Sequence, residues 1–209
     1  MYQARAGMIH HRLASLYHHS YRATLQSSSD VVVDNQLGNR NKKLKQLSEL
    51  HYVKATTIFT NLCMFSQAIR AILERAGLME AFLASSKTDS AKYKVLLLIL
   101  DIILEAENVI KKIVGREDDD EVNKEELDQE KKMMETVLQR LQFTLLSMIK
   151  ASSGSNNAKN KRKSEKKTSD NTIVKDAYAA TLKYSSENSN FSRDLLELIE
   201  IILKDRSNM

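Results

Sequence analysis

The sequence predicts an all-α protein in which helix hairpins pack into a bundle. It contains no proline among its 209 residues, although an average usage of about 5% would give roughly ten. It contains only five glycines, which leaves few residues for the positive φ angles of tight strand hairpins. No segment alternates apolar and polar residues with the period of two that a strand requires. We therefore expect long helices joined by polar loops.

The N-terminal segment predicts a first helix with a wide apolar face, because its apolar residues recur at spacings of three and four. The polar stretch 26–43 is expected to be a mobile loop inserted before a second helix that starts near Asn41. A third helix begins around Phe65. No proline or glycine separates it from the second, so the two could form one bent helix. The first helix carries two neighbouring apolar rows, Tyr2, Ala6, Ile9, Leu13 and Leu16, and Ala14, Tyr17 and Tyr21.

Capping residues set the bounds expected for the next helices. Thr88 or Asp89 is a suitable N-cap for a fourth helix that runs to about Val114, where Gly115 is a natural stop. This helix is apolar almost all round, which predicts a central position. Asn123, followed three residues later by a glutamate, resembles a capping box for a fifth helix. Two further helices are expected, one near 172–184 and one that carries Phe191, Leu195, Leu198, Ile199 and Ile202.

The charge pattern divides the chain further. The formal net charge is +5, and most of it is expected in a Ser/Asn/Lys-rich linker at 152–170, predicted to be disordered. We expect a bundle at 1–151 and a helical hairpin at 171–209. The rest of the chain then shows no basic excess for phosphate binding. The linker's exposed basic run is a candidate nuclear-import signal or a solvated spacer. Its candidate residues are Lys161, Arg162, Lys163, Lys166 and Lys167.

A short motif in the first hairpin indicates a particular kind of helix pairing. Leu13, Ala14 and Tyr17 fit the large, small and aromatic positions of the first helix of a tetratricopeptide repeat. Ala55 and Phe59 fit the corresponding positions of its second helix. A small residue at the crossing lets the two helices approach closely. The insertion between them adds nearly thirty residues to the usual repeat of about 34.

The sequence segments around this motif resemble the C-terminal region of the erythroid differentiation-related factor 1 family. The matching segments are 9–18 (IHHRLASLYH), 50–55 (LHYVKA), 79–82 (MEAF), 100–102 (LDI) and 140–146 (RLQFTLL). The resemblance implies the C-terminal part of a longer nuclear protein with tetratricopeptide-like repeats. It also implies a role in erythroid gene expression and in the DNA-binding activity of a GATA-type transcription factor.

No pattern of residues predicts an enzyme. The sequence lacks a nucleophile elbow, a phosphate-binding loop and a dinucleotide fingerprint. The histidines at 10, 11, 18 and 19 are not spaced by three or four, so a zinc site would need His51 from the second helix. The acidic run at 118–121 lacks the glycine of a calcium loop. We expect no metal, no cofactor and no small-molecule substrate.

Two further expectations concern compartment and surface. Cys63 lies in an apolar stretch and is predicted to be a small buried residue rather than a reactive thiol. The most apolar run, 95–104, is too short for the roughly 18 to 20 residues that cross a bilayer. The start of the chain lacks the apolar core of a signal peptide. We therefore expect an intracellular protein without membrane contact.

The function that follows is a non-enzymatic scaffold for protein–protein interaction in a nuclear, transcription-regulatory setting. The candidate partner-binding residues lie beside the repeat motif and are Arg12, His18 and Arg22. Two alternatives remain open. One is direct nucleic-acid binding through the basic linker, and the other is a structural cap that closes a longer array of helical repeats.

Overall fold

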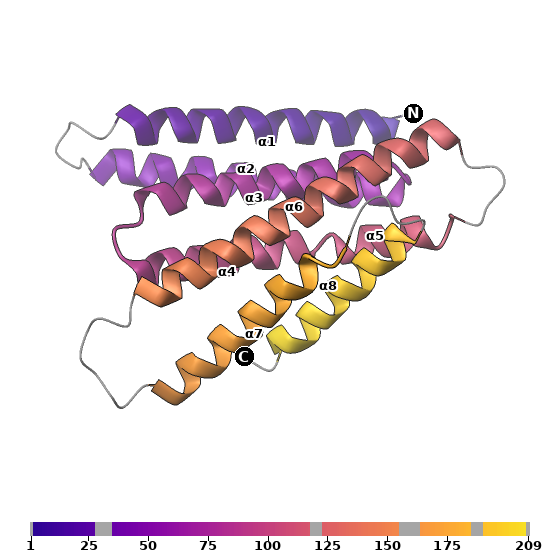
Figure 1. The fold of residues 1–209 in the computed structure, drawn as a ribbon. Coiled ribbons are helices and arrows are strands. Elements are labelled where there is room, and N and C mark those ends of the chain that lie inside the picture. Colours follow the sequence, from indigo (N-terminus) through magenta and orange to yellow (C-terminus); the bar gives the residue numbers. More distant parts are fainter. Residues whose placement is uncertain (1, 28–34, 118–122, 155–163, 185–189, 208–209) are drawn as a thin grey trace. The chain divides into compact units, whose positions relative to one another are not determined.

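The computed structural model describes residues 2–27, 35–117, 123–154, 164–184 and 190–207, and all regular secondary structure in these ranges is helical (Figure 1). The predicted all-α fold is confirmed. The chain forms two compact units, residues 1–81 and 82–209, which are described separately below. No helix in the described ranges is both long and apolar enough to span a membrane.

The first unit is built on a helix hairpin. Helices α1 (Tyr2–Ser27) and α2 (Asn35–Asn61) lie antiparallel, side by side (Figure 1), and α3 (Phe65–Ser85) follows. Ala14 on α1 and Ala55 on α2 are completely buried, as the repeat motif predicts. The hydroxyl of Ser48 donates a hydrogen bond of 2.9 Å to the carbonyl oxygen of Ala14. The two backbones therefore approach closely at this crossing.

The segment that joins these two helices is shorter than we predicted. Helix α1 continues to Ser27 and α2 already begins at Asn35, whereas the sequence indicates a loop over 26–43. The early start of α2 has a local reason, since leucine, arginine, lysine and glutamine are good helix formers and no proline interrupts them. Residues 28–34 lie outside the described ranges.

Helices α2 and α3 are separate, and the break falls at Cys63. This residue has a φ of 56°, in the left-handed region. The amide of Met64 donates to the carbonyl of Phe59 at 2.9 Å, and the amide of Cys63 donates to the carbonyl of Thr60 at 3.4 Å. These two bonds form a Schellman motif with Cys63 at the position that usually holds glycine. The prediction of a buried cysteine is wrong, because the turn exposes its side chain.

This cap predicts a gain in stability from one substitution. Cys63→Gly should be more stable than Cys63→Ala by about 0.5–1 kcal/mol, because only glycine adopts this φ without steric strain and part of that gain is offset by chain entropy. Cys63→Ala is the matched control, since it removes the thiol and keeps the strain. Urea denaturation followed by circular dichroism measures the difference. Equal midpoints for the two variants would contradict the cap.

The second unit contains two helices where we predicted one. Helix α4 (Asp89–Leu104) ends ten residues before the predicted stop, and α5 (Glu107–Val114) follows. Of the two predicted caps, Thr88 and not Asp89 is the observed one, because the Thr88 hydroxyl accepts a bond of 3.2 Å from the amide of Ala91. The break has a tertiary reason: α4 packs mainly against α6 (Lys124–Gly154), whereas α5 packs against α8 (Phe191–Ser207).

The remaining helices complete this unit. Asn123 caps α6 by accepting a bond of 3.0 Å from the amide of Glu125, as the sequence predicts. Helix α7 (Ser164–Thr181) starts earlier than expected, so residues 164–170 are helical where we predicted a disordered linker. Glutamate and lysine are good helix formers, and this stretch holds neither proline nor glycine. Residues 155–163 lie outside the described ranges, and the predicted domain bounds at 151 and 171 stay predictions.

Candidate functional site: the first helix hairpin

The inner side of α1 is lined by small residues. Gly7 and Ala14 are both buried against α2. A Cβ atom added at Gly7 would lie 2.8 Å from Cε1 of Phe59 and 3.0 Å from Cγ2 of Ile58. Real Cβ atoms do not approach other atoms so closely, so α2 occupies the space that a side chain at Gly7 would need. This contact fixes which side of α1 faces the hairpin.

A chain of polar side chains joins the three helices of this unit. The Tyr52 hydroxyl of α2 donates to Oε2 of Glu74 on α3 at 3.2 Å. The same hydroxyl lies 3.2 Å from Nδ1 of His18 on α1, and Nε2 of His11 lies 3.0 Å from Oε2 of Glu74. Since the tyrosine proton points to the carboxylate, His18 donates through Nδ1. The half-buried Glu74 carboxylate thus accepts hydrogen bonds from side chains of two helices, α1 and α2.

Burial and charge tune the groups in this network. Burial lowers the pKa of His18, and the positive charge of Arg22 adds to this effect. Burial alone would raise the pKa of Glu74, but hydrogen bonding and charge from His11 outweigh it, so that pKa is lowered. Burial and the carboxylate of Glu74 raise the pKa of Tyr52. The arrangement therefore favours a neutral His18 beside an ionised Glu74.

A second cluster of histidines lies at the hairpin interface. Nδ1 of His10 is 2.7 Å from Nδ1 of His51, and the ring of Tyr17 stacks on His51 with centroids 5.8 Å apart. Burial lowers the pKa of His51, as do the neighbouring charges of His10 and Lys54. Two imidazoles make an incomplete metal site. Over the described ranges no three His, Cys, Asp or Glu residues come together to hold a metal ion. The acidic run 118–121 lies outside those ranges.

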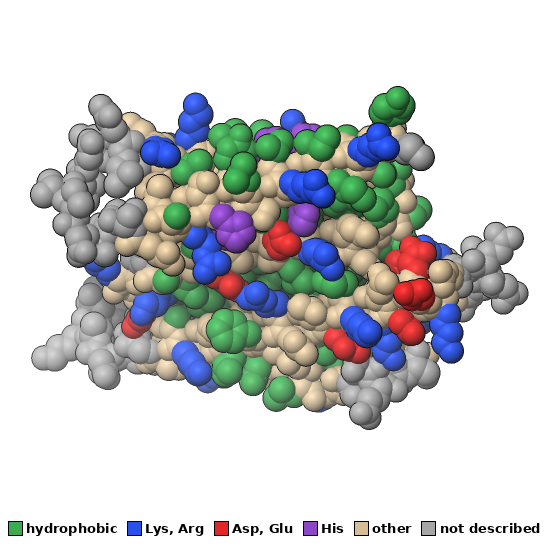
Figure 2. Space-filling view, turned by 90° about the horizontal axis from the view of Figure 1, so that it is seen from above, with side chains coloured by type: hydrophobic (Ala, Val, Ile, Leu, Met, Phe, Trp, Pro, Cys, Tyr) green, Lys and Arg blue, Asp and Glu red, His purple; other side chains and the backbone are tan. Residues whose placement is uncertain are grey.

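The structure reverses one expectation for α1. Tyr2, Ile9 and Leu16 belong to the row expected on its apolar face, yet their exposed fractions are 88%, 57% and 60%. The second row is the buried one, with Ala14 and Tyr21 inside. The reason is the small residue at Gly7, which lets α2 pack on that side. Hydrophobic side chains consequently lie in the open beside Lys, Arg and His side chains on the face seen in Figure 2.

The three predicted partner-binding residues lie in different environments. Arg12 and Arg22 are exposed, and both are accessible to a partner. His18 is half-buried and bonded to Tyr52, so its first role is to join α1 to α2. Its binding role stays a prediction, as do those of the two arginines. Tyr52 lies in the segment 50–55 that carries the family resemblance, but no sequence pattern assigned a role to Tyr52 or to Glu74.

Charge is distributed differently from the sequence expectation. Residues 1–81 contain ten Lys and Arg against five Asp and Glu, whereas residues 82–209 contain 22 of each. The basic residues of segment 152–170 are therefore balanced within their own unit, and the N-terminal unit carries the excess. Of the import candidates, Lys161, Arg162 and Lys163 lie outside the described ranges. Lys166 and Lys167 lie in α7, so the run is in part helical rather than extended.

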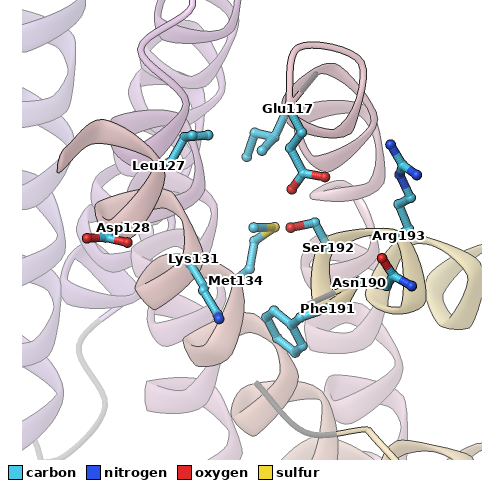
Figure 3. A pocket seen from close by; sticks show the side chains of 10 residues that line it. Glu117, Leu127, Asp128, Lys131, Met134, Asn190, Phe191, Ser192 and Arg193 are labelled. Carbon is cyan, nitrogen blue, oxygen red and sulfur yellow. The ribbon is translucent and has the colours of Figure 1, made fainter. Parts of the chain in front are cut away.

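The second unit holds a cavity of about 370 Å³ between the end of α5, the start of α6 and the start of α8 (Figure 3). Its rim carries carboxylates from Glu117 and Asp128 and cations from Lys131 and Arg193. Met134 and other apolar side chains line its floor. Because the two signs of charge are balanced, the cavity selects no class of charged ligand. The α1–α2 hairpin remains the better candidate site.

A helix hairpin closed by small residues, in a chain whose described ranges are otherwise helical, defines a tetratricopeptide-like helical-repeat protein. The sequence profile described as "Erythroid differentiation-related factor 1-like, TPR repeats" matches residues 1–208. The chain belongs to this family, as its resemblance implied.

Curated relatives agree with this assignment. Erythroid differentiation-related factor 1 of Mus musculus is 31% identical over 224 residues, covering 96% of this chain and 16% of the relative. The protein of the same name from Homo sapiens is 29% identical over 224 residues, with the same coverage. That from Pongo abelii is 31% identical over 229 residues, covering 96% of this chain and 17% of the relative. The chain thus spans about one sixth of their length. No solved structure matches it.

Proposed function

We propose that this chain is a non-enzymatic scaffold for protein–protein interaction and acts in a nuclear, transcription-regulatory protein. The observation that carries the proposal is the outward side of α1. There Ile9 and Leu16 are exposed between arginines, although a solvated helix face is ordinarily polar. Exposed apolar groups with a polar surround are typical of protein-binding surfaces.

The family assignment supports the same function. Helical repeats present extended surfaces to their partners, and each unit adds to that surface. The relatives are named for erythroid differentiation, and the resemblance set out above makes a GATA-type transcription factor the first partner to test. The basic segment that contains Lys161, Arg162 and Lys163 is the proposed import signal.

Affinity capture from nuclear extract tests the scaffold function. The tagged chain should retain a defined set of proteins, and Arg12→Ala/Arg22→Ala should lose them, because both side chains are exposed on α1. Arg40→Ala/Lys42→Ala is the matched control, since it removes two exposed charges from the start of α2. If the Arg12/Arg22 variant retains the same proteins as the wild type, the proposal is wrong.

The proposed import signal has its own test. The tagged chain, expressed in cells, should no longer accumulate in the nucleus when the five import candidates are replaced by alanine.

A further inference from the structure

The exposed side of α1 carries a regular seven-residue repeat. Its members are separated alternately by three and four residues, and all of them are exposed. We call this set the outer seam of α1. It consists of Tyr2, Arg5, Ile9, Arg12, Leu16, His19, Ala23 and Gln26.

Two kinds of residue alternate in the outer seam. One position of the repeat holds Tyr2, Ile9, Leu16 and Ala23, which are the apolar members. The other holds Arg5, Arg12, His19 and Gln26, which are basic or polar. A repeat of 3.5 residues per turn is the pattern by which one helix packs along another in a coiled coil. The outer seam spans roughly 36 Å at 1.5 Å per residue, and the hairpin leaves it open.

From this pattern we propose that the outer seam binds an acidic amphipathic helix of a partner protein. That helix would place apolar side chains on Ile9 and Leu16 and carboxylates opposite Arg5 and Arg12. The proposal rests on the scaffold function and names the chemistry of its partner. Arginine suits this position, because its stem covers apolar surface while its guanidinium pairs with a carboxylate.

Charge distinguishes this partner from a second copy of the chain. Residues 2–27 contain three arginines and no aspartate or glutamate. Parallel pairing of two outer seams would place each arginine against its own copy. Antiparallel pairing would place it against an apolar residue, with no carboxylate on either α1 to pair with it. An acidic helix would place a carboxylate against each arginine, so charge complementarity favours it over a second copy of the chain.

A designed peptide tests the proposal on the complete chain. The probe carries leucine at the positions that face the apolar members and glutamate at those that face the basic members. A control peptide carries lysine in place of each glutamate. In fluorescence anisotropy titrations the glutamate peptide should bind about tenfold more tightly or better, since two exposed charge pairs together contribute about 1.4 kcal/mol. Equal affinity for the two peptides would overturn the proposal.

Variants of the chain sharpen the test. Arg5→Glu/Arg12→Glu should reverse the preference, so that the lysine peptide binds more tightly. Ile9→Ser/Leu16→Ser should weaken both peptides by about tenfold or more, because it removes the apolar contacts. Arg40→Glu, an exposed arginine at the start of α2, should leave the preference unchanged. These residues are exposed, so circular dichroism should show that the fold is kept.

Two other occupants would overturn the proposal. One is a dimer of the chain, seen by sedimentation, that Ile9→Ser/Leu16→Ser dissociates. The other is binding to phosphatidylserine vesicles that depends on Arg5 and Arg12 while the glutamate peptide does not bind. The affinity-capture experiment distinguishes failure of the acidic-helix proposal from failure of the scaffold function. If capture requires Arg12 and Arg22 but the peptide preference is absent, the acidic helix is wrong and the scaffold function stands.

Discussion

Arg116→Ala should destabilise the C-terminal unit by about 3 kcal/mol or more at pH 7. The carboxylate of Glu130 is only 1% exposed and pairs with the guanidinium of Arg116, which also contacts Glu126 at 3.4 Å. Burial raises the pKa of Glu130, and the arginine opposes this. Without the arginine the buried carboxyl must protonate on folding. Removing one partner of a buried ion pair typically costs about 3–5 kcal/mol, because the remaining group is left buried without a compensating charge.

The pH dependence of this variant identifies the cause. Because folded Glu130 would then hold a proton that the unfolded chain releases above pH 4.5, the stability deficit should shrink on acidification from pH 7 to about 5. Urea denaturation at both pH values measures it. Arg116→Ala/Glu130→Met should recover most of the loss, since it removes the unpaired charge as well.

A surface arginine in the same unit provides the control. Arg206 forms two bonds with Asp101, of 3.1 and 3.2 Å, at an exposed site. Arg206→Ala should cost only about 0.2–1 kcal/mol, because solvent screens an exposed pair. If Arg116→Ala costs no more than Arg206→Ala, the buried pair does not hold the α5–α6 connection.

Gly7→Ala should destabilise the N-terminal unit by about 1–3 kcal/mol, the usual cost of overpacking a close contact. The added Cβ would lie 2.8 Å from the ring of Phe59, and that ring is itself buried. The same change ordinarily stabilises a helix, because alanine has a higher helix propensity than glycine. A loss of stability in Gly7→Ala, rather than a gain, would therefore show that α1 and α2 are in close contact at Gly7.

Gly38→Ala is the matched control for this sign. Gly38 lies in α2, and a Cβ added there meets nothing within 4 Å. This variant should gain about 0.5–1 kcal/mol. Thermal unfolding of both variants against wild type measures the difference. A gain in both would show that α1 and α2 do not touch at Gly7.

Local signals in the sequence predicted much of the fold. Thr88, with Asp89 as the alternative, and Asn123 were predicted as helix caps because a capping side chain bonds to an amide two or three residues along the chain. The repeat motif placed Ala14 and Ala55 at a helix crossing for a similar reason, since a small residue between apolar neighbours indicates close packing. Features that depend on tertiary partners were missed. The break between α4 and α5 is one, because each half packs on a different helix.

The polar network was missed for the same reason. Tyr52 and Glu74 lie 22 residues apart on different helices, and no short-range pattern relates them to His11 or His18. The predicted candidates Arg12 and Arg22 are exposed, but His18 belongs first to this network. Sequence spacing showed which residues share a helix. Only the packed hairpin showed which of their side chains already form hydrogen bonds within it.

Helix α1 shows what its sequence determined and what depended on the tertiary structure. Its sequence alone predicted a helix from Tyr2 through Tyr21, with apolar residues over much of its surface and with arginines but no carboxylate. Spacing could not determine which apolar row is buried, because both rows satisfy the period of a helix. The tertiary structure decided it through close approach at Gly7 and Ala14. Since the small residues face α2, the bulkier Ile9 and Leu16 remain outside, where the proposed partner binds.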